Sequence, residues 1–391
     1  MPADAIPTAA ADVLTRTTAL VPLLRTNAEV TERARRVLDE HTEALAEAGV
    51  FRMTAPRRHG GAEADFQTQC DVLAEIARAC PSTSWVATIY SAMSWLVGTF
   101  PDEAQDEILG DGDPRISGVF SPTGTLRRVD GGVRVKGRWP FNTGGHGSRW
   151  TVLNAIMPSD DGGGVPTCVI VRSQELTRLD DWYASGMAGT GSNTVVADDI
   201  FVPAHRVQAL PDMLEARYPA RHNAGNPYHG YPLAAVLVVN AGGTPVGIVR
   251  GALEAFGEKL HGRPISYTTY TNKAEAPITH LQIAEATLLL DSADAHVRLA
   301  TGILDRHEDT RSTQSRVKAR AHVSYATGLA RQAVDLLFYA SGASSIQSQV
   351  PIQRLQRDMQ ALANHAVMHA PTGMELYGRV LCGLPPNTPL Y

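Results

Sequence analysis

The chain is poor in cysteine, and its cysteines form no pattern. No two of the four have the CxxC spacing of a zinc ribbon or a redox pair; they are Cys70, Cys80, Cys168 and Cys382. Scattered cysteines are typical of proteins in a reducing compartment. The sequence therefore predicts no metal site, no disulfide framework and a cytoplasmic location.

Features of several other protein classes are also missing. A formal net charge of -5 over 391 residues, without a run of like charge, argues against nucleic-acid binding. The first five residues have no basic region followed by an apolar core, so we expect no secretory signal. The most apolar run, residues 231–249, is broken by Pro232, Asn240 and Pro245. It is better interpreted as the start of a buried helix than as a membrane span.

The spacing of apolar residues changes along the chain. Residues 13–109 have the period of helices, and Ser82, Thr83 and Ser84 are predicted to cap a helix that begins at Trp85. Residues 116–206 alternate with period two around glycine and aspartate clusters, which favours an antiparallel sheet or a small barrel. Helical periodicity then returns in four long segments, as in a helical bundle; they are residues 244–261, 277–306, 313–341 and 352–370.

These three zones predict an α+β chain that is mostly α. The predicted domains are an N-terminal helical domain (1–112), a central β domain (113–215) and a C-terminal helical domain (216–391). A dinucleotide-binding fingerprint is absent, because the glycines of residues 186–191 lead into a strand and not into a helix.

Four motifs carry a resemblance to a known family. They are Pro-Arg-Arg-His-Gly-Gly at residues 56–61, Gly-Arg-Trp-Pro-Phe-Asn-Thr-Gly-Gly at 137–145, Gly-Thr-Gly-Ser-Asn at 189–193 before the strand at 199–203, and the tail at 376–385. In this order the chain resembles the acyl-CoA dehydrogenase superfamily, and its tail resembles the flavin-dependent monooxygenase branch. The resemblance implies N-terminal helices, a central antiparallel β-barrel, a C-terminal four-helix bundle and a homotetramer.

The segment at residues 141–145 has the chemistry of a flavin wall. Glycines such as Gly144 allow a backbone to approach a flat ring, and Phe141 can stack beside it. The resemblance assigns cofactor contacts to Phe141, Asn142, Thr143 and Gly144, and Thr143 would hydrogen-bond flavin N5. It also assigns cofactor binding to residues in the bundle, namely Arg263, Ser341 and Gly342. A glycine-rich turn and a surface arginine are the plain alternatives.

The most informative position is His365. It follows Arg357-Asp358 where a dehydrogenase of similar layout carries a glutamate, and residues 233–250 contain no Asp or Glu that could replace that base. An imidazole has a pKa near neutrality and suits proton transfer on a phenol, an indole or a flavin peroxide. His365 and His369 are predicted to share one helical stripe, so a metal pair or two ordinary helix histidines are alternatives.

The helix that begins near Trp85 is expected to line the substrate pocket through Tyr90, Met93 and Trp95, together with His369. Phenol hydroxylases of this branch commonly carry a histidine where this chain has Met93. That departure favours an electron-rich indole, pyrrole or polyketide, or an amine, as substrate. Core packing is the alternative role for Met93 and Trp95.

The resemblance thus implies the oxygenase component of a two-component monooxygenase. It would use reduced flavin (FADH2 or FMNH2) from a separate NAD(P)H:flavin reductase, together with O2, and hydroxylate an electron-rich aromatic small molecule through a flavin C4a-hydroperoxide. Three alternatives remain: an N-oxygenase of an amine or amino sugar, an acyl-CoA dehydrogenase with a displaced base, and a catalytically silent helical scaffold.

Overall fold

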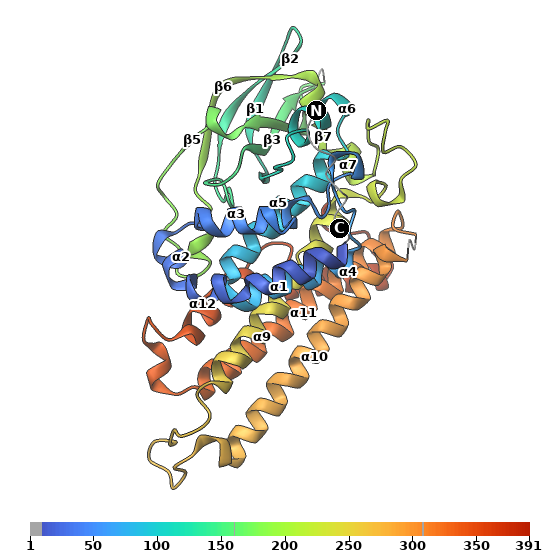
Figure 1. Cartoon of the computed structure of the whole chain (residues 1–391). Coiled ribbons are helices and arrows are strands. Elements are labelled where there is room, and N and C mark those ends of the chain that lie inside the picture. The colour runs from blue at the N-terminus through green and yellow to red at the C-terminus, as the bar shows by residue number, and fades with distance from the viewer. Residues whose placement is uncertain (1–9, 160, 307–308) are drawn as a thin grey trace.

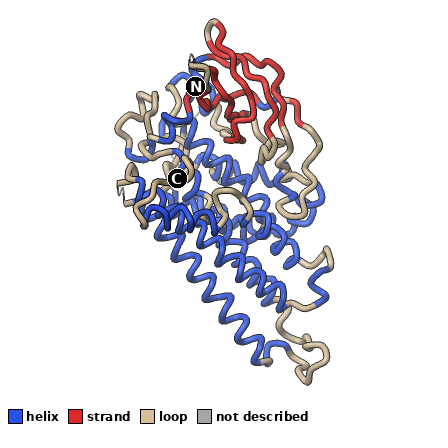
Figure 2. The backbone as a smooth tube through the Cα atoms, turned by 180° about the vertical axis from the view of Figure 1, so that it is seen from behind, coloured by secondary structure: helices blue, strands red, loops and turns tan. Residues whose placement is uncertain are grey.

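A β-sheet lies at one end of the molecule, and two long helices extend away from it (Figure 1). This computed structural model describes residues 10–159, 161–306 and 309–391. The strands form a single group that helices flank on one side (Figure 2). The order along the chain is helices, strands, helices, as the sequence predicts.

The N-terminal helices are α1 (Ala10–Thr26), α2 (Ala28–Ala34), α3 (Asp39–Glu47), α4 (Phe66–Ala79), α5 (Pro81–Val97) and α6 (Asp102–Leu109). Helix α5 is buried along almost its whole length. The predicted cap at Ser82, Thr83 and Ser84 is wrong, because these residues lie inside α5 and Cys80 holds the cap position. The reason is Pro81, whose fixed φ and missing N–H suit the first helical position.

The strands are β1 (Ile116–Val129), β2 (Gly132–Trp139), β3 (Trp150–Pro158), β4 (Gly164–Arg172), β5 (Thr177–Arg178), β6 (Val195–Pro203) and β7 (Val207–Ala209). They form one seven-stranded sheet in the order β5-β6-β2-β1-β3-β4-β7. A turn at Asp130-Gly131 joins β1 and β2 in a hairpin, and Gly131 there has φ +74°. Not every pairing is antiparallel, since β1 and β3 run parallel. Residues 140–149 return the chain to the start of β1, so that β3 runs in the same direction.

The sheet curls around an apolar core of its own. That core includes Val135, Trp139 and Leu153, and β4 contacts β6 although three strands separate them in the sheet. Within the described chain the end strands β5 and β7 do not pair, so the predicted barrel is an open, curled sheet. The sheet packs on the helical core at the end where β3 begins and β4 finishes, through Trp150 and Ile170.

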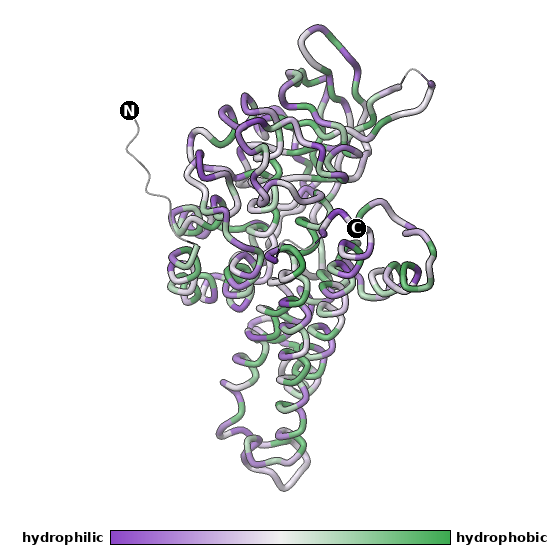
Figure 3. Tube along the Cα trace, turned by 90° about the vertical axis from the view of Figure 1, so that its right-hand side faces the viewer, coloured by the Kyte–Doolittle hydropathy of each residue, from purple (hydrophilic) through white to green (hydrophobic). Residues whose placement is uncertain are grey.

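The C-terminal helices are α7 (Leu210–Leu214), α8 (Leu233–Asn240), α9 (Gly243–Gly257), α10 (Pro277–Asp305), α11 (Thr313–Ala340), α12 (Pro351–Ala363) and α13 (Ala370–Leu381). Along the bundle in Figure 3, apolar and polar residues alternate, as expected for helices with one buried face. Helix α4 packs closely on α9, because a Cβ at Gly243 or Gly247 would lie 2.1 Å from a backbone oxygen of α4. An N-terminal helix is therefore part of the bundle's packing.

The apolar run that begins α8 is a core element. Leu233–Gly257 is long and apolar enough to cross a membrane, but 89% of its most apolar window is buried inside the protein. The interpretation of this run as a buried helix start is therefore confirmed.

The helix predicted over residues 352–370 is confirmed as far as Ala363, but its predicted end is wrong. Helix α12 ends at Ala363, and turns lead from Asn364 to the new helix α13. Pro371 explains the break: it has no N–H to donate to a continuing helix, and its ring would clash with the preceding turn. His365 and His369 therefore do not share a helical stripe.

Candidate active site

The loop that follows β2 presents an aromatic ring on a fixed backbone. Phe141 has φ +63°, an uncommon value for a residue with a side chain, and its ring is 67% exposed. That ring meets Trp182 edge-to-face at 5.8 Å between centroids. Gly144 has φ +72°, and a Cβ there would lie 2.8 Å from the ring of Tyr90. The loop is thus packed against α5 and leaves Phe141 free to contact a ligand.

A chain of buried hydroxyl groups lies behind this loop. Thr143 Oγ1 is 2.8 Å from Ser192 Oγ, and Ser192 Oγ is 2.7 Å from Thr190 Oγ1. Thr190 Oγ1 donates to the backbone oxygen of Met187 at 2.7 Å. All three hydroxyl side chains are less than 7% exposed. The predicted residue Thr143 is therefore the outer member of an ordered chain of hydrogen bonds.

The same peptide segment is tied to α12. The backbone N–H of Met187 donates to Asp358 Oδ1 at 2.5 Å, and Asp358 is 3% exposed. Burial raises the pKa of the Asp358 carboxyl to about 7, and the hydrogen bond from Met187 acts in the opposite direction. In the sequence, Asp358 served only as a landmark, and Thr190 and Ser192 were named only as part of the motif at 189–193. The hydroxyl residues at positions 190, 192 and 194 were the available signal for this network.

His365 lies in the turn after α12, beside α5. Its ring meets Trp85 edge-to-face at 5.0 Å between centroids. His365 is exposed in the single chain, although many protein atoms lie around its ring. Burial lowers the pKa of His365 to about 4, and the nearby positive charge of Arg320 adds to the effect. The imidazole is neutral at pH 7, and its nitrogens have no hydrogen bond to any described residue.

Family models match both helical parts of the chain. The acyl-CoA dehydrogenase N-terminal domain matches residues 20–109, and the acyl-CoA dehydrogenase C-terminal domain matches residues 240–370. The chain is 34% identical to a flavin-dependent monooxygenase oxygenase subunit, HsaA, of Rhodococcus jostii over 95% of this chain and 98% of that one. It is 32% identical to the oxygenase component of an FADH(2)-dependent resorcinol hydroxylase of a Rhizobium species, over 95% of this chain and 94% of that one.

Two solved structures are similar to this chain over almost its whole length. The 3-HSA hydroxylase of Rhodococcus sp. RHA1 superposes with a TM-score of 0.89 at 32% identity, over 97% of this chain and 99% of that one. XiaF of a Streptomyces species, solved with FADH2 and glycerol, has a TM-score of 0.89 at 29% identity, over 97% of each chain.

The chain belongs to the acyl-CoA dehydrogenase superfamily. Within it, the chain is a member of the flavin-dependent monooxygenases.

The residues of the loop after β2 fit the flavin of this superfamily. Phe141 offers an exposed aromatic ring, and Thr143 offers a hydroxyl at the same place. Asn142 is 1% exposed, and its side-chain oxygen has no hydrogen-bond partner among the described residues. An unpaired buried acceptor is costly unless a ligand satisfies it.

The other residues predicted to bind cofactor lie elsewhere in this chain. Arg263 is exposed in the loop between α9 and α10, at the end of the bundle remote from the sheet (Figure 1). The backbone N–H of Lys273 donates to the Arg263 oxygen at 2.7 Å, and the Lys273 ammonium donates to Ala340, next to Ser341 and Gly342. The structure thus brings Arg263, Ser341 and Gly342 near one another, but not near the Phe141 loop of the same chain.

The predicted pocket residues on α5 are core residues in this chain. The hydroxyl of Tyr90 donates to the Gly144 oxygen, so Tyr90 holds the loop that carries Phe141. Met93 is 1% exposed, and the Trp95 indole donates to the Tyr228 oxygen at 2.8 Å. Their contact with substrate stays a prediction.

The metal alternative for His365 and His369 receives no support. His369 holds the cap position of α13, and its carbonyl accepts a bond from Thr372. No group of three potential metal ligands occurs among the described residues.

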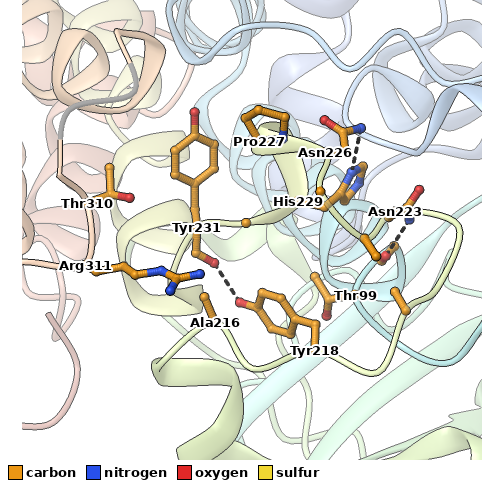
Figure 4. A pocket seen from close by; sticks show the side chains of 15 residues that line it. Thr99, Ala216, Tyr218, Asn223, Asn226, Pro227, His229, Tyr231, Thr310 and Arg311 are labelled. Carbon is orange, nitrogen blue, oxygen red and sulfur yellow. Dashed lines mark hydrogen bonds between the residues drawn. The ribbon is translucent and has the colours of Figure 1, made fainter.

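Two open pockets lie near the far end of α5, beside residues 218–231. The first has a volume of about 430 Å³ and includes Asn223, His229 and Arg311 in its lining, as Figure 4 shows. The second has a volume of about 610 Å³ and shares Asn226 and Tyr231 with the first. None of the predicted site residues lines either pocket.

Proposed function

We propose that this chain is the oxygenase component of a two-component monooxygenase that hydroxylates an electron-rich aromatic compound of the phenol, indole or polyketide type. The observation that carries the proposal is His365, an imidazole beside Trp85 with no hydrogen-bond partner among the described residues, at the position where a dehydrogenase of this superfamily needs a carboxylate. The curated relatives named above are oxygenase components, which supports a separate flavin reductase as partner.

When bound, reduced flavin supplies the chemistry that activates O2 and transfers one oxygen atom to the substrate. The chain's own residues would bind and orient the reactants. The exposed ring of Phe141 would pack beside the isoalloxazine, and Thr143 would hold the hydrogen bond to N5. The loop after β2, which packs on α5, would keep water away, since water promotes the unproductive release of hydrogen peroxide.

His365 would act as the proton acceptor for the substrate. Removing the proton from a phenol or an indole nitrogen raises the electron density of the ring carbon that receives oxygen. The ring nitrogens of His365 have no hydrogen-bond partner among the described residues, and the imidazole is neutral at pH 7, so a nitrogen lone pair is available to the substrate's proton. An exposed edge beside Trp85 gives a substrate access to the ring.

The main rival, a dehydrogenase with a displaced base, lacks a free carboxylate. Asp358 is the carboxyl group on α12 closest in sequence to His365, and it is engaged by the Met187 N–H. No Asp or Glu occurs in residues 233–250, the other position at which the superfamily carries its base. Abstraction of a proton alpha to a thioester has no base among these groups.

We also propose a homotetramer in the cytoplasm. Helix α10 exposes Leu281, Leu288 and Leu299 along its length, and each is at least 48% exposed in the single chain. The distance between Arg263 and the Phe141 loop within one chain supports a cofactor site shared between subunits. The absence of paired cysteines supports the location, since all four are free.

The function is tested with purified chain, chemically reduced FMN or FAD and 18O2. Phenols, indoles and amines are supplied separately, and products are analysed by mass spectrometry. We expect 18O in an aromatic product only when the chain is present. Oxygen transfer to amines alone would identify an N-oxygenase. Anaerobic reduction of bound flavin by acyl-CoA thioesters would identify a dehydrogenase, and failure to bind either flavin would contradict the proposal altogether.

A further inference from the structure

The hydroxyl chain behind the flavin loop has only one possible arrangement of protons. It contains three short oxygen–oxygen contacts: Thr143 to Ser192, Ser192 to Thr190, and Thr190 to the Met187 carbonyl. Each contact of 2.7–2.8 Å needs one proton between its oxygens. The three hydroxyl groups supply three protons in total.

The direction follows from the carbonyl end. The Met187 oxygen carries no proton, so Thr190 must donate to it. Thr190 has then used its proton, and the contact with Ser192 must be filled by the Ser192 proton. The contact between Thr143 and Ser192 is in turn filled by the Thr143 proton. The Thr143 oxygen is left with free lone pairs and no proton to offer.

Such a hydroxyl can accept a hydrogen bond from a ligand but cannot donate one. Flavin N5 carries a proton in the reduced form and only a lone pair in the oxidised form. We infer that Ser192 and Thr190 fix Thr143 as a hydrogen-bond acceptor, and that the site thereby selects reduced over oxidised flavin. This inference rests on the proposed function, because it requires flavin N5 to lie at Thr143.

The selection has a use in a two-component enzyme. Reduced flavin must be captured from solution after a separate reductase releases it, and oxidised flavin must leave at the end of the cycle. An acceptor opposite N5 favours the first event and disfavours retention of the product. Ser192 and Thr190 are positioning residues here, because they act through Thr143.

The decisive variant is Ser192→Ala. It removes the acceptor of the Thr143 proton, so that Thr143 becomes free to donate to N5 of oxidised flavin. We expect the ratio of the oxidised to the reduced dissociation constant to fall about tenfold, the size of one mismatched buried hydrogen bond. The midpoint potential of bound flavin should fall by about 30 mV, which is the same tenfold change for a two-electron couple. Thr190→Val should shift both quantities in the same direction.

Two controls separate this effect from general damage. Ser192→Thr keeps the hydroxyl and should retain the ratio of the unmodified chain. Ser148→Ala removes a hydroxyl from a neighbouring cluster with Ser117 and Ser173 that has no contact with Thr143, and should change neither quantity.

The measurements are anaerobic titrations with dithionite-reduced flavin, aerobic titrations with oxidised flavin, and a spectroelectrochemical midpoint. If Ser192→Ala binds both forms with an unchanged ratio, or weakens both equally, the inference is overturned. If the unmodified chain binds neither form, the proposed function itself has failed, and this outcome is distinct from the first.

Discussion

A buried carboxyl group on α12 gives the sharpest prediction about stability. Asp358 is 3% exposed, and burial raises its pKa from 3.8 to about 7. Between these two pH values the unfolded chain is ionised at this position while the folded protein still holds the proton. Stability therefore falls as pH rises through this window and becomes level above about pH 7. The difference between the two pKa values corresponds to a loss on the order of 4 kcal/mol.

Asp358→Asn tests this sign and magnitude. The amide keeps an oxygen that can accept the Met187 N–H, and like the protonated acid it carries no charge. We expect the stability of the variant, relative to the unmodified chain, to increase from pH 5 to pH 7.5 by about 2.5 kcal/mol, the part of the total that falls within this range. The assay is urea unfolding of flavin-free protein at four pH values, followed by tryptophan fluorescence.

A matched control is Asp198→Asn. Asp198 is an exposed carboxylate whose pKa is lowered, chiefly by its hydrogen bond with Lys136, so its removal should give no gain of stability with rising pH. Parallel pH curves for Asp358→Asn and the unmodified chain would refute the reasoning, because they would mean that Asp358 ionises equally easily in both states.

Three further predictions concern the flavin loop and the proton acceptor. His365→Gln should lower kcat about 100-fold, while the dissociation constant for reduced flavin stays within twofold. In the unmodified chain, the acid limb of the pH profile of kcat should lie well below pH 6, because the pKa of His365 is about 4. An acid limb near pH 6.5 would contradict the assignment. Thr143→Val should increase the hydrogen peroxide released per flavin oxidised, measured by a peroxidase-coupled assay, whereas an unchanged yield would remove Thr143 from the site. Gly144→Ala should destabilise the fold by about 1–3 kcal/mol and weaken flavin binding, because φ is +72° and the new Cβ would lie 2.8 Å from the ring of Tyr90; urea midpoints and flavin titrations check both effects.

The sequence allowed the architecture to be predicted because its signals are local. A change from helical to alternating periodicity marks the sheet, and the Asp130-Gly131 pair is a local turn signal at the position where the structure has a hairpin. The parallel pairing of β1 with β3 was missed because it depends on the path of residues 140–149, which no periodicity records. The break after Ala363 was missed although its cause, Pro371, is visible in the sequence.

The candidate site was predictable only in part, because the sequence reveals only those features that lie within one segment. The chemistry of residues 141–145 is local, and the structure shows the exposed ring of Phe141 and the buried hydroxyl of Thr143 there. The groups behind this loop come from distant segments. Asp358 and Met187 are 171 residues apart in the chain, and their hydrogen bond joins α12 to the peptide segment before β6. A pattern within one segment cannot indicate such a contact.

The two acid–base groups next to the candidate site are therefore best understood together. Asp358 is buried with a raised pKa and accepts a backbone hydrogen bond, so it supports the segment that carries Thr190 and Ser192. His365 is neutral, lacks a hydrogen-bonding partner and keeps exposed surface. A dehydrogenase needs a free carboxylate where this chain has the imidazole. In this chain the carboxyl group of Asp358 holds a backbone segment, and the proposed proton acceptor is His365. This arrangement favours oxygen transfer over removal of a carbon-bound proton.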